Sequence, residues 1–131
     1  MIKCQYTLYL ANKPDAMTRI TRILADAKVN IEGISVAEST DAALVQLVVG
    51  DDASARKALS RAKIPYTTQN VSVIVLPHRP GVLALLASRL QKAKTHINYV
   101  YATAPDDDSR CCLVISATDL KHVERIVRTL K

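Results

Sequence analysis

The chain repeats itself, and this repeat limits the fold more than any other feature of the sequence. The first 63 residues match the rest at an offset of 66, which rises to 68 after one hairpin, so that Pro14 matches Pro80. Matching apolar residues recur three and four positions apart, the spacing of one helix face. We therefore expect two equivalent repeats, 1–69 and 70–131. The matching positions are Met17, Ile20, Leu24 and Ala27 with Leu83, Leu86, Leu90 and Ala93, then Ala55, Ala58, Leu59 and Ala62 with Val123, Ile126, Val127 and Leu130.

Each repeat shows the same order of predicted elements. Alternating apolar and polar side chains, as in residues 2–10, predict half-buried strands, and Asn, Asp or Pro stands where each helix is expected to begin. Residues 66–76 have strand composition throughout, so one strand can end the first repeat and begin the second. The expected strands are 2–10, 30–39, 42–49, 66–76, 97–104 and 111–117. The four expected helices end at about Lys28, Ile64-Pro65, Lys94 and the chain end. Asp51 or Asp52 is expected to cap the second helix, and Asp119 the fourth. Thr40-Asp41 is the expected turn of the first hairpin.

The order β-α-β-β-α-β followed by β-α-β-β-α predicts an α+β fold of two ferredoxin-like units. Right-handed crossovers place both helices of each unit on one face of an antiparallel sheet. The strand equivalent to residues 65–69 is missing after Lys131, so we expect an open edge in the second sheet. Val71, Val73 and Val75 make the face away from the helices apolar. We expect the other repeat, a second chain in a homodimer, or both to cover that surface.

The composition is globular and narrows the range of partners. Lys and Arg number 18 against 12 Asp and Glu, but they are dispersed along the chain, and there is no Phe or Trp. Dispersed charge and few aromatic rings disfavour a nucleic-acid binder. No stretch approaches the roughly 20 apolar residues of a membrane span, and the start resembles no signal peptide, so we expect a cytoplasmic protein. Cys4, Cys111 and Cys112 are expected to be reduced, buried and inert, with the last two on opposite strand faces.

Two pairs of segments carry a family resemblance. They are 10–17 (LANKPDAM) with 29–33 (VNIEG), and 76–83 (LPHRPGVL) with 96–101 (HINYVY). In each pair a strand end leads into a helix, and a polar residue precedes the next strand. The pairs resemble the ACT domain, a small ligand-binding regulatory module, and the chain resembles small stand-alone proteins of two tandem ACT domains. The resemblance implies that an amino acid or similar small metabolite binds where two such units meet.

The turn between the first strand and first helix of each repeat suits this role. The unpaired N–H groups of a helix N-terminus attract a carboxylate, and glycine lets it approach the backbone. Gly81 offers this, whereas Asp15 stands at the matching place and would compete with an anionic ligand. We expect Gly81→Val to abolish binding and leave the fold intact. The ligand-binding residues that the resemblance implies are Asn12, Pro14, Asn30, Ile31, His78, Arg79, Pro80, Gly81, Val82, Leu83, His96 and Asn98.

Several of these residues also have a purely structural interpretation. Without the resemblance, Asn12 reads as a helix cap, Asn30 as a polar strand start and Pro80-Gly81 as a turn. A metal site at His78 and His96 lacks a third ligand at a usual spacing. Asp106-Asp107-Asp108 has the composition of a solvated hairpin tip and lacks the spacing of a calcium loop.

The sequence contains no pattern that indicates catalysis. No nucleophile with a partnered base, phosphate loop or marked carboxylate pair is found, so we expect a binding protein without cofactor or metal. The leading hypothesis is a non-catalytic regulatory protein that binds an amino acid or similar metabolite. The alternatives are the regulatory subunit of an amino-acid biosynthetic enzyme and, suggested by charge alone, a basic nucleic-acid binder.

Overall fold

The observed elements follow the predicted order along the chain. The computed structural model describes residues 1–38, 41–103 and 110–130, and the chain divides into two units. The first unit is Cys4–Gln69, and the second is Met1–Lys3 with Asn70–Lys131. The repeat boundaries, 1–69 and 70–131, stay a prediction. Thr40 of the expected hairpin and the Asp106-Asp107-Asp108 turn lie outside the described residues.

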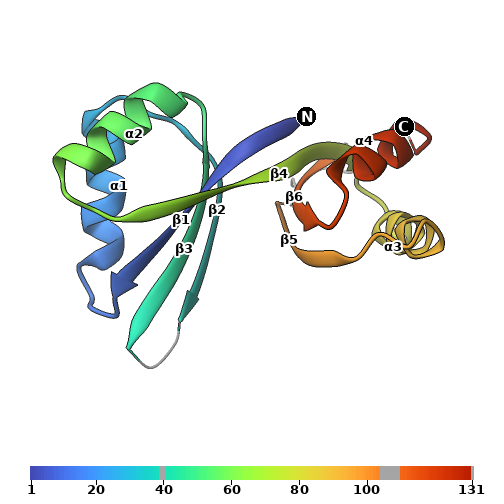
Figure 1. The fold of residues 1–131 in the computed structure, drawn as a ribbon, viewed down its shortest axis with the longest axis horizontal. Coiled ribbons are helices and arrows are strands. Elements are labelled where there is room, and N and C mark those ends of the chain that lie inside the picture. The colour runs from blue at the N-terminus through green and yellow to red at the C-terminus, as the bar shows by residue number, and fades with distance from the viewer. Residues whose placement is uncertain (39–40, 104–109, 131) are drawn as a thin grey trace. The chain divides into compact units, whose positions relative to one another are not determined.

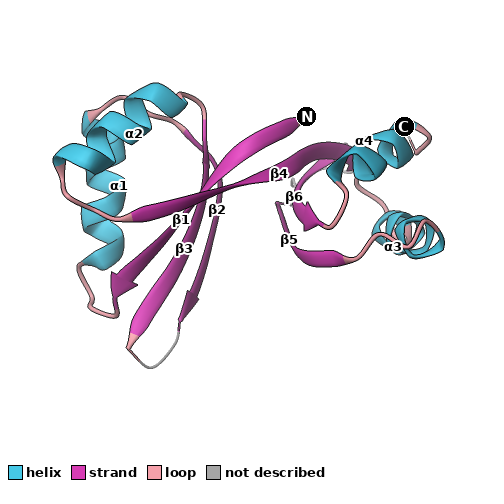
Figure 2. Ribbon diagram, viewed as in Figure 1, coloured by secondary structure: helices cyan, strands magenta, loops and turns pink. Residues whose placement is uncertain are grey.

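The first unit is a sheet with α1 and α2 on one face (Figures 1 and 2). Its strands lie in the order β2-β3-β1-β4, and β3 runs antiparallel to both β1 and β2. This is the predicted ferredoxin-like arrangement. The elements are β1 (Ile2–Ala11), α1 (Ala16–Asp26), β2 (Ile31–Glu38), β3 (Ala42–Val49), α2 (Asp52–Arg61) and β4 (Tyr66–Pro77), of which β4 continues into the second unit.

The core of the first unit lies between the helices and one face of the sheet. Tyr6 pairs with Leu47 and Leu8 with Val45, so apolar side chains of neighbouring strands share that face. The helix positions predicted from the repeat complete the core. Its buried members are Tyr6, Leu8, Ile20, Leu24, Val29, Val45, Leu47, Val49, Ala55, Leu59 and Ile64.

β1 differs from the predicted half-buried strand, because part of it is buried on both faces. Gln5 is 0% and Thr7 is 7% exposed. The Gln5 side-chain amide donates a hydrogen bond to Thr7 Oγ1 at 3.3 Å, which gives these polar groups a partner inside the protein. The alternating pattern therefore predicted where the strand lies, but it did not predict that part of the strand is buried on both faces.

Tyr6 also connects β1 to α2. Its hydroxyl donates to Asp52 Oδ1 at 2.8 Å and accepts from Arg56 Nε at 3.0 Å. The Arg56 guanidinium lies 5.8 Å from the centre of the Tyr6 ring, within the range of a cation–π contact. Burial and the bond to Asp52 raise the pKa of Tyr6 above its usual value, so the phenol remains a neutral donor.

The second unit repeats this arrangement with α3 and α4 over its sheet (Figure 1). The strands lie in the order β1-β4-β6-β5, and β6 is antiparallel to both β4 and β5. The further elements are α3 (Val82–Lys92), β5 (Ile97–Thr103), β6 (Arg110–Ala117) and α4 (Leu120–Arg128). The buried core residues are Ile74, Leu76, Val82, Leu86, Leu90, Leu113, Ile115, Val123 and Val127. None of the described helices has the length and apolar character needed to cross a membrane.

The predicted open edge of the second sheet is occupied, which corrects the sequence-based expectation. Val73 N donates to Met1 O at 2.8 Å, and the Met1 ammonium donates back to Val73 O at 2.9 Å. The ammonium also lies 2.6 Å from Glu124 Oε1 of α4. The start of the chain thus takes the place of the missing final strand. Sequence order hides this, because 72 residues separate the two partners.

Each sheet has a register shift at the same place in its unit. The shifts lie between Ile31 and Gly33 of β2 and between Ile97 and Tyr99 of β5. After the second shift Tyr99 lies opposite Ser116, so the alternation of faces along β5 changes there. A bulge at equivalent positions is consistent with the repeat.

The cysteines were predicted correctly in part. None of the three forms a disulfide, and all are half-buried rather than buried. Cys111 packs against the core, whereas Cys112 pairs with Val75 on the other face of the sheet, as expected for strand neighbours.

The helix starts agree with prediction for α2 and α4. Asp51 accepts a hydrogen bond from Ser54 N, and Asp119 accepts one from His122 N, each at 3.1 Å. α1 begins later than expected, with Asp15 rather than Asn12 at its N-cap position and Pro14 before it.

The helix ends share one device that the sequence analysis did not identify. α2 ends at Arg61, before the expected Ile64-Pro65. The cause is the left-handed backbone of Lys63, with φ 56°. Lys28 and Lys94 have φ 57° at the same place after α1 and α3.

Candidate functional site

A cavity of about 220 Å³ lies at the β4–α3 turn of the second unit. β5 and β4 are both antiparallel to β6, so their C-terminal ends meet at one edge, where β6 begins. Most of the lining is apolar. The lining residues are Leu76, Pro77, His78, Arg79, Val82, Leu83, Ala102, Thr103, Cys111 and Leu113.

The turn residues bring charge to this apolar cavity. Arg79 is exposed and His78 is half-buried, and both line the cavity. Leu83, in the first turn of α3, is 48% exposed. The site thus combines an aliphatic wall with a guanidinium and an imidazole, a combination that suits a small ligand with an apolar part and a negative charge.

Gly81 has a backbone role that was not foreseen. It occupies the N-cap position of α3 with φ 91° and ψ −12°, a left-handed conformation that favours glycine. A Cβ built at this position meets no atom within 4 Å. A β-branched residue is strained at this φ, so Gly81→Val would also cost stability, and an intact fold in that variant stays a prediction.

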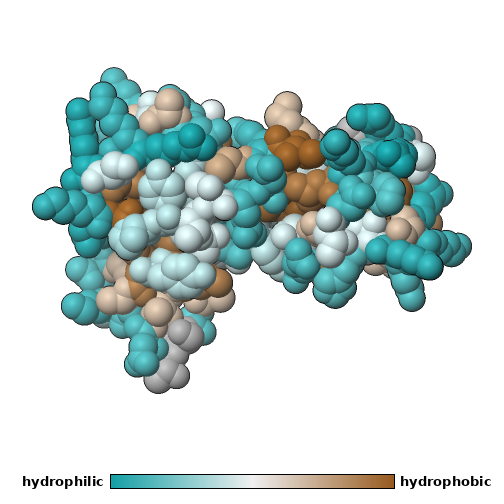
Figure 3. Space-filling model, viewed as in Figure 1, coloured by the Kyte–Doolittle hydropathy of each residue, from teal (hydrophilic) through white to brown (hydrophobic). Residues whose placement is uncertain are grey.

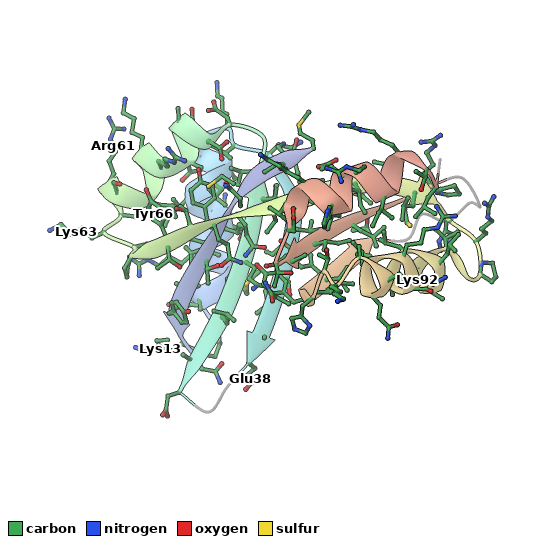
Figure 4. The ribbon with its side chains drawn as sticks, turned by 45° about the vertical axis from the view of Figure 1, so that its right-hand side comes forward. Lys13, Glu38, Arg61, Lys63, Tyr66 and Lys92 are labelled. Atoms are coloured by element: carbon green, nitrogen blue, oxygen red, sulfur yellow. The ribbon has the colours of Figure 1, made fainter. Side chains whose placement is uncertain are left out.

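The first unit has a smaller and more polar cavity at its β1–α1 turn. Its volume is about 160 Å³, and Lys13, Asp15 and Arg19 lie in its wall. Asn12 points elsewhere, since its side-chain amide donates to Glu38 Oε1 at 2.9 Å. Figure 4 shows Lys13 and Glu38 near the same end of the first sheet. Asn12 thus connects the turn to the end of β2.

The residues before β2 and β5 lie at the other end of each sheet. Ile97 pairs with Ala117 and Thr103 with Cys112, so roughly 20 Å of strand separates His96 from the cavity edge. His96 N donates to Thr118 Oγ1 at 3.0 Å, and Asn98 Nδ2 to Ser116 Oγ at 3.2 Å.

Asn30 and Ile31 occupy the matching place in the first unit. Asn30 O accepts a hydrogen bond from Gly50 N at 3.0 Å, and Ile31 pairs with Val49. Within one unit, then, the predicted residues divide into a turn group and a strand-start group. The histidines His78 and His96 are likewise apart, and no group of three metal-binding side chains occurs in the described ranges.

Six residues that line the cavity were absent from the predicted site: Leu76, Pro77, Ala102, Thr103, Cys111 and Leu113. Ala102, Thr103 and Cys111 come from the end of β5 and the start of β6. The predicted topology contained the signal, because parallel strands such as β4 and β5 end at one edge of a sheet. Their neutral side chains carry no motif that would have drawn attention to them.

The comparisons with known proteins agree with this fold. Residues 7–69 match the family model described as the AHAS small subunit-like ACT domain. No curated protein matches the chain in sequence.

Solved structures extend the likeness over nearly the whole chain. A Bacteroides thetaiotaomicron protein is 26% identical, with a TM-score of 0.89, 98% of this chain covered and 88% of that one. The ligand-free regulatory subunit of aspartate kinase from Thermus thermophilus is 14% identical, with a TM-score of 0.68 and coverage of 95% and 88%. The same subunit from Thermus flavus is 14% identical, with a TM-score of 0.66 and coverage of 99% and 93%. The chain therefore has a tandem ACT-type fold, the fold of these regulatory subunits, and its residues 7–69 match the AHAS small subunit-like ACT domain.

Proposed function

We propose that this chain is a non-catalytic regulatory protein that binds an amino acid or similar small metabolite at the β4–α3 turn. The observation that carries the proposal is the cavity of about 220 Å³ at that turn, in which His78, Arg79, Val82 and Leu83 take part. The likeness in fold to aspartate kinase regulatory subunits supports a regulatory role. The dispersed charge and the cysteines without disulfides suit a cytoplasmic protein.

The turn offers two kinds of attraction to a carboxylate. The first-turn N–H groups of α3 have no acceptor within the helix and carry the positive end of its dipole. Arg79 adds a full positive charge at the cavity wall. Pro80 and Gly81 hold the turn, and the left-handed Gly81 leaves its surroundings open.

The strand-start residues Asn30, Ile31, His96 and Asn98 enter the proposal through a second copy of the chain. They lie far from the turn of their own unit, so they can approach a bound ligand only from another molecule or repeat. We propose a homodimer that brings one copy's strand start to the other copy's turn. Light scattering that shows a strict monomer at micromolar concentration, with and without ligand, would contradict it.

A thermal-shift screen of the common amino acids and related carboxylates tests the ligand proposal. A ligand that binds the folded state raises the unfolding temperature. The rise should disappear in Arg79→Gln and persist in Lys13→Gln, the matching residue of the first unit. If no compound changes the unfolding temperature, the proposal is wrong.

A second candidate is the regulatory subunit of a separate biosynthetic enzyme. It is favoured by the chain's fold, which is similar to that of the Thermus thermophilus subunit. A similar structure contains the alpha and beta subunits of aspartokinase. Affinity capture from a native extract should then return a catalytic subunit in stoichiometric amount, and recovery of the chain alone would argue against this candidate.

A further inference from the structure

We propose that the groove between α1 and α2 of the first unit binds an acidic amphipathic helix of a partner protein. This inference goes beyond the proposed function and does not depend on the ligand at the β4–α3 turn. It rests on the shape of the groove, on the positive charge of its α2 wall, and on the different residues at the same place in the second unit.

Two adjoining depressions form the groove. One has a volume of about 390 Å³ and the other of about 210 Å³, and they share Ala27, Ala58 and Arg61. Ile23, Ala27 and Ala62 pack against the core of the unit, yet all three are half-buried rather than buried. The short side chains along the groove let another chain approach both helices closely. The lining residues are Ile23, Asp26 and Ala27 on one wall and Ser54, Lys57, Ala58, Arg61 and Ala62 on the other.

The dimensions of the groove suit a helix. On the α2 wall the lining runs from Ser54 to Ala62, which is about 12 Å along the helix axis. Side chains four residues apart on a second helix are separated by about 6 Å, so two of them can enter the two depressions. Both walls are helices, so the groove offers no strand edge with which an extended peptide could pair. A helical partner needs no such edge, because it satisfies its own backbone hydrogen bonds.

The α2 wall carries positive charge that has no counter-charge of its own. Lys57 and Arg61 are both exposed, and neither side chain forms an ion pair within the described parts of the chain. They are four residues apart, a spacing at which like charges repel each other on a helix. Figure 4 shows Arg61 extending from α2 away from the sheet. On the α1 wall, Asp26 is four residues from Arg22, so opposite charges attract there. Asp or Glu residues on a partner helix would therefore complement the α2 wall.

The matching residues of the second unit fill the same place. Ile126 stands where the first unit has Ala58, and it packs against the core of the second unit. Arg89 stands where the first unit has Ile23, and its guanidinium donates to Thr129 Oγ1, which connects α3 to α4. The same pair of helices thus has larger side chains between them in the second unit, so the inference assigns the partner helix to the first unit.

Selection from a displayed peptide library, with the full chain as the target, tests the chemistry of the partner. The library consists of random peptides of about 16 residues, enough for four helical turns. We expect enrichment of peptides in which apolar residues recur three or four positions apart with Asp or Glu beside them. Absence of enrichment, or enrichment of basic or proline-rich peptides, would overturn the inference.

Matched variants locate the binding surface, with fluorescence anisotropy of a selected peptide as the measurement. Ala58→Ile introduces the side chain of the second unit and should weaken binding at least tenfold. Ala53→Ile, the same change on an exposed residue of α2 outside the groove, should leave binding unchanged. Lys57→Gln should weaken binding at least threefold, whereas Arg125→Gln, at the matching position of α4, should not. Circular dichroism checks that the variants are folded. Unchanged binding in both Ala58→Ile and Lys57→Gln would refute the assignment to this groove.

Two further measurements identify other occupants of the groove. A second copy of the chain would give a dimer that light scattering detects in the parent and not in Ala58→Ile. A labelled DNA duplex would bind the parent in a salt-dependent way, and this binding would be lost in Lys57→Gln and retained in Ala58→Ile. Either result would overturn the proposal, because it would assign the α2 wall to a different partner.

Discussion

Replacing Lys63 with glycine should stabilise the protein. Lys63 follows α2 with φ 56°, and its exposed side chain points away from the helix (Figure 4). Ile64 N donates to Leu59 O at 3.0 Å, and Lys63 N donates to Ser60 O at 3.1 Å. This pair of bonds is the Schellman motif, in which glycine usually occupies the left-handed position.

The expected gain is the difference between two backbone effects. A left-handed conformation costs an L-residue with a Cβ about 1 to 2 kcal/mol. Glycine removes this cost, but it also has more conformational freedom in the unfolded chain, which offsets about 0.4 to 1 kcal/mol of the gain. The free energy of unfolding should therefore rise by about 0.5 to 1 kcal/mol. Lys28 and Lys94 have φ 57° in the same position, so the triple variant should gain about 2 kcal/mol if the distant sites add.

Urea unfolding followed by circular dichroism measures this change. The matched control is Lys57→Gly, on an exposed position inside α2, which should lose about 1 kcal/mol because glycine is a poor helix former. If Lys63→Gly is no more stable than the parent while the control behaves as expected, the reasoning from the left-handed backbone is refuted. The side chains of α1 and α2 in Figure 3 present a largely hydrophilic outer surface, so neither change should affect solubility.

Three further predictions concern the second unit. Gly81→Val should lower the free energy of unfolding by about 2 kcal/mol because of its φ, whereas Gly81→Asn should cost less because Asn tolerates this region; equal urea midpoints would contradict this. Asp119→Ala should destabilise α4 and Asp119→Asn should not at neutral pH, because Asn also caps helices; thermal unfolding compares them. Partial burial raises the pKa of Glu124, but hydrogen bonds from the Met1 ammonium and Ser72 outweigh this effect, so the pKa lies below its usual value. Ionised Glu124 therefore contributes to the free energy of unfolding above about pH 4.3, and this contribution is lost as pH falls through the lower pKa of the folded state. In Glu124→Gln the free energy of unfolding should fall less steeply in acid.

The repeat made most of the fold predictable. One helix-face spacing and one strand pattern, each found twice, fixed the element order and the core positions such as Ile20, Leu24, Leu86 and Leu90, all of which are buried. Local rules were weaker at the helix ends. Pro65 suggested where α2 stops, but the backbone of Lys63 ends it earlier, and nothing in a lysine side chain marks a left-handed residue.

The structural features missed from sequence depend on contacts between distant segments. Met1 pairs with Val73 at the edge of the second sheet, and the order of elements along the sequence does not predict this pairing. Ala102 and Cys111 line the cavity only because β5 and β6 carry them to the end of β4. Motif reasoning found the charged and glycine residues of the turn, and missed the neutral residues that shape the space beside it.

The two turns show why repeat symmetry is a poor guide to ligand chemistry. The core residues of the two units match in kind, because any apolar side chain of suitable volume preserves the packing. The cavity residues are under no such constraint, and a change of one side chain alters charge or space directly. Asp15 against Gly81 changes both the backbone conformation and the local charge. A duplicated fold can therefore keep one unit as a ligand site while the other diverges in its binding chemistry, and a ligand-binding residue in one repeat has to be tested against its partner in the other.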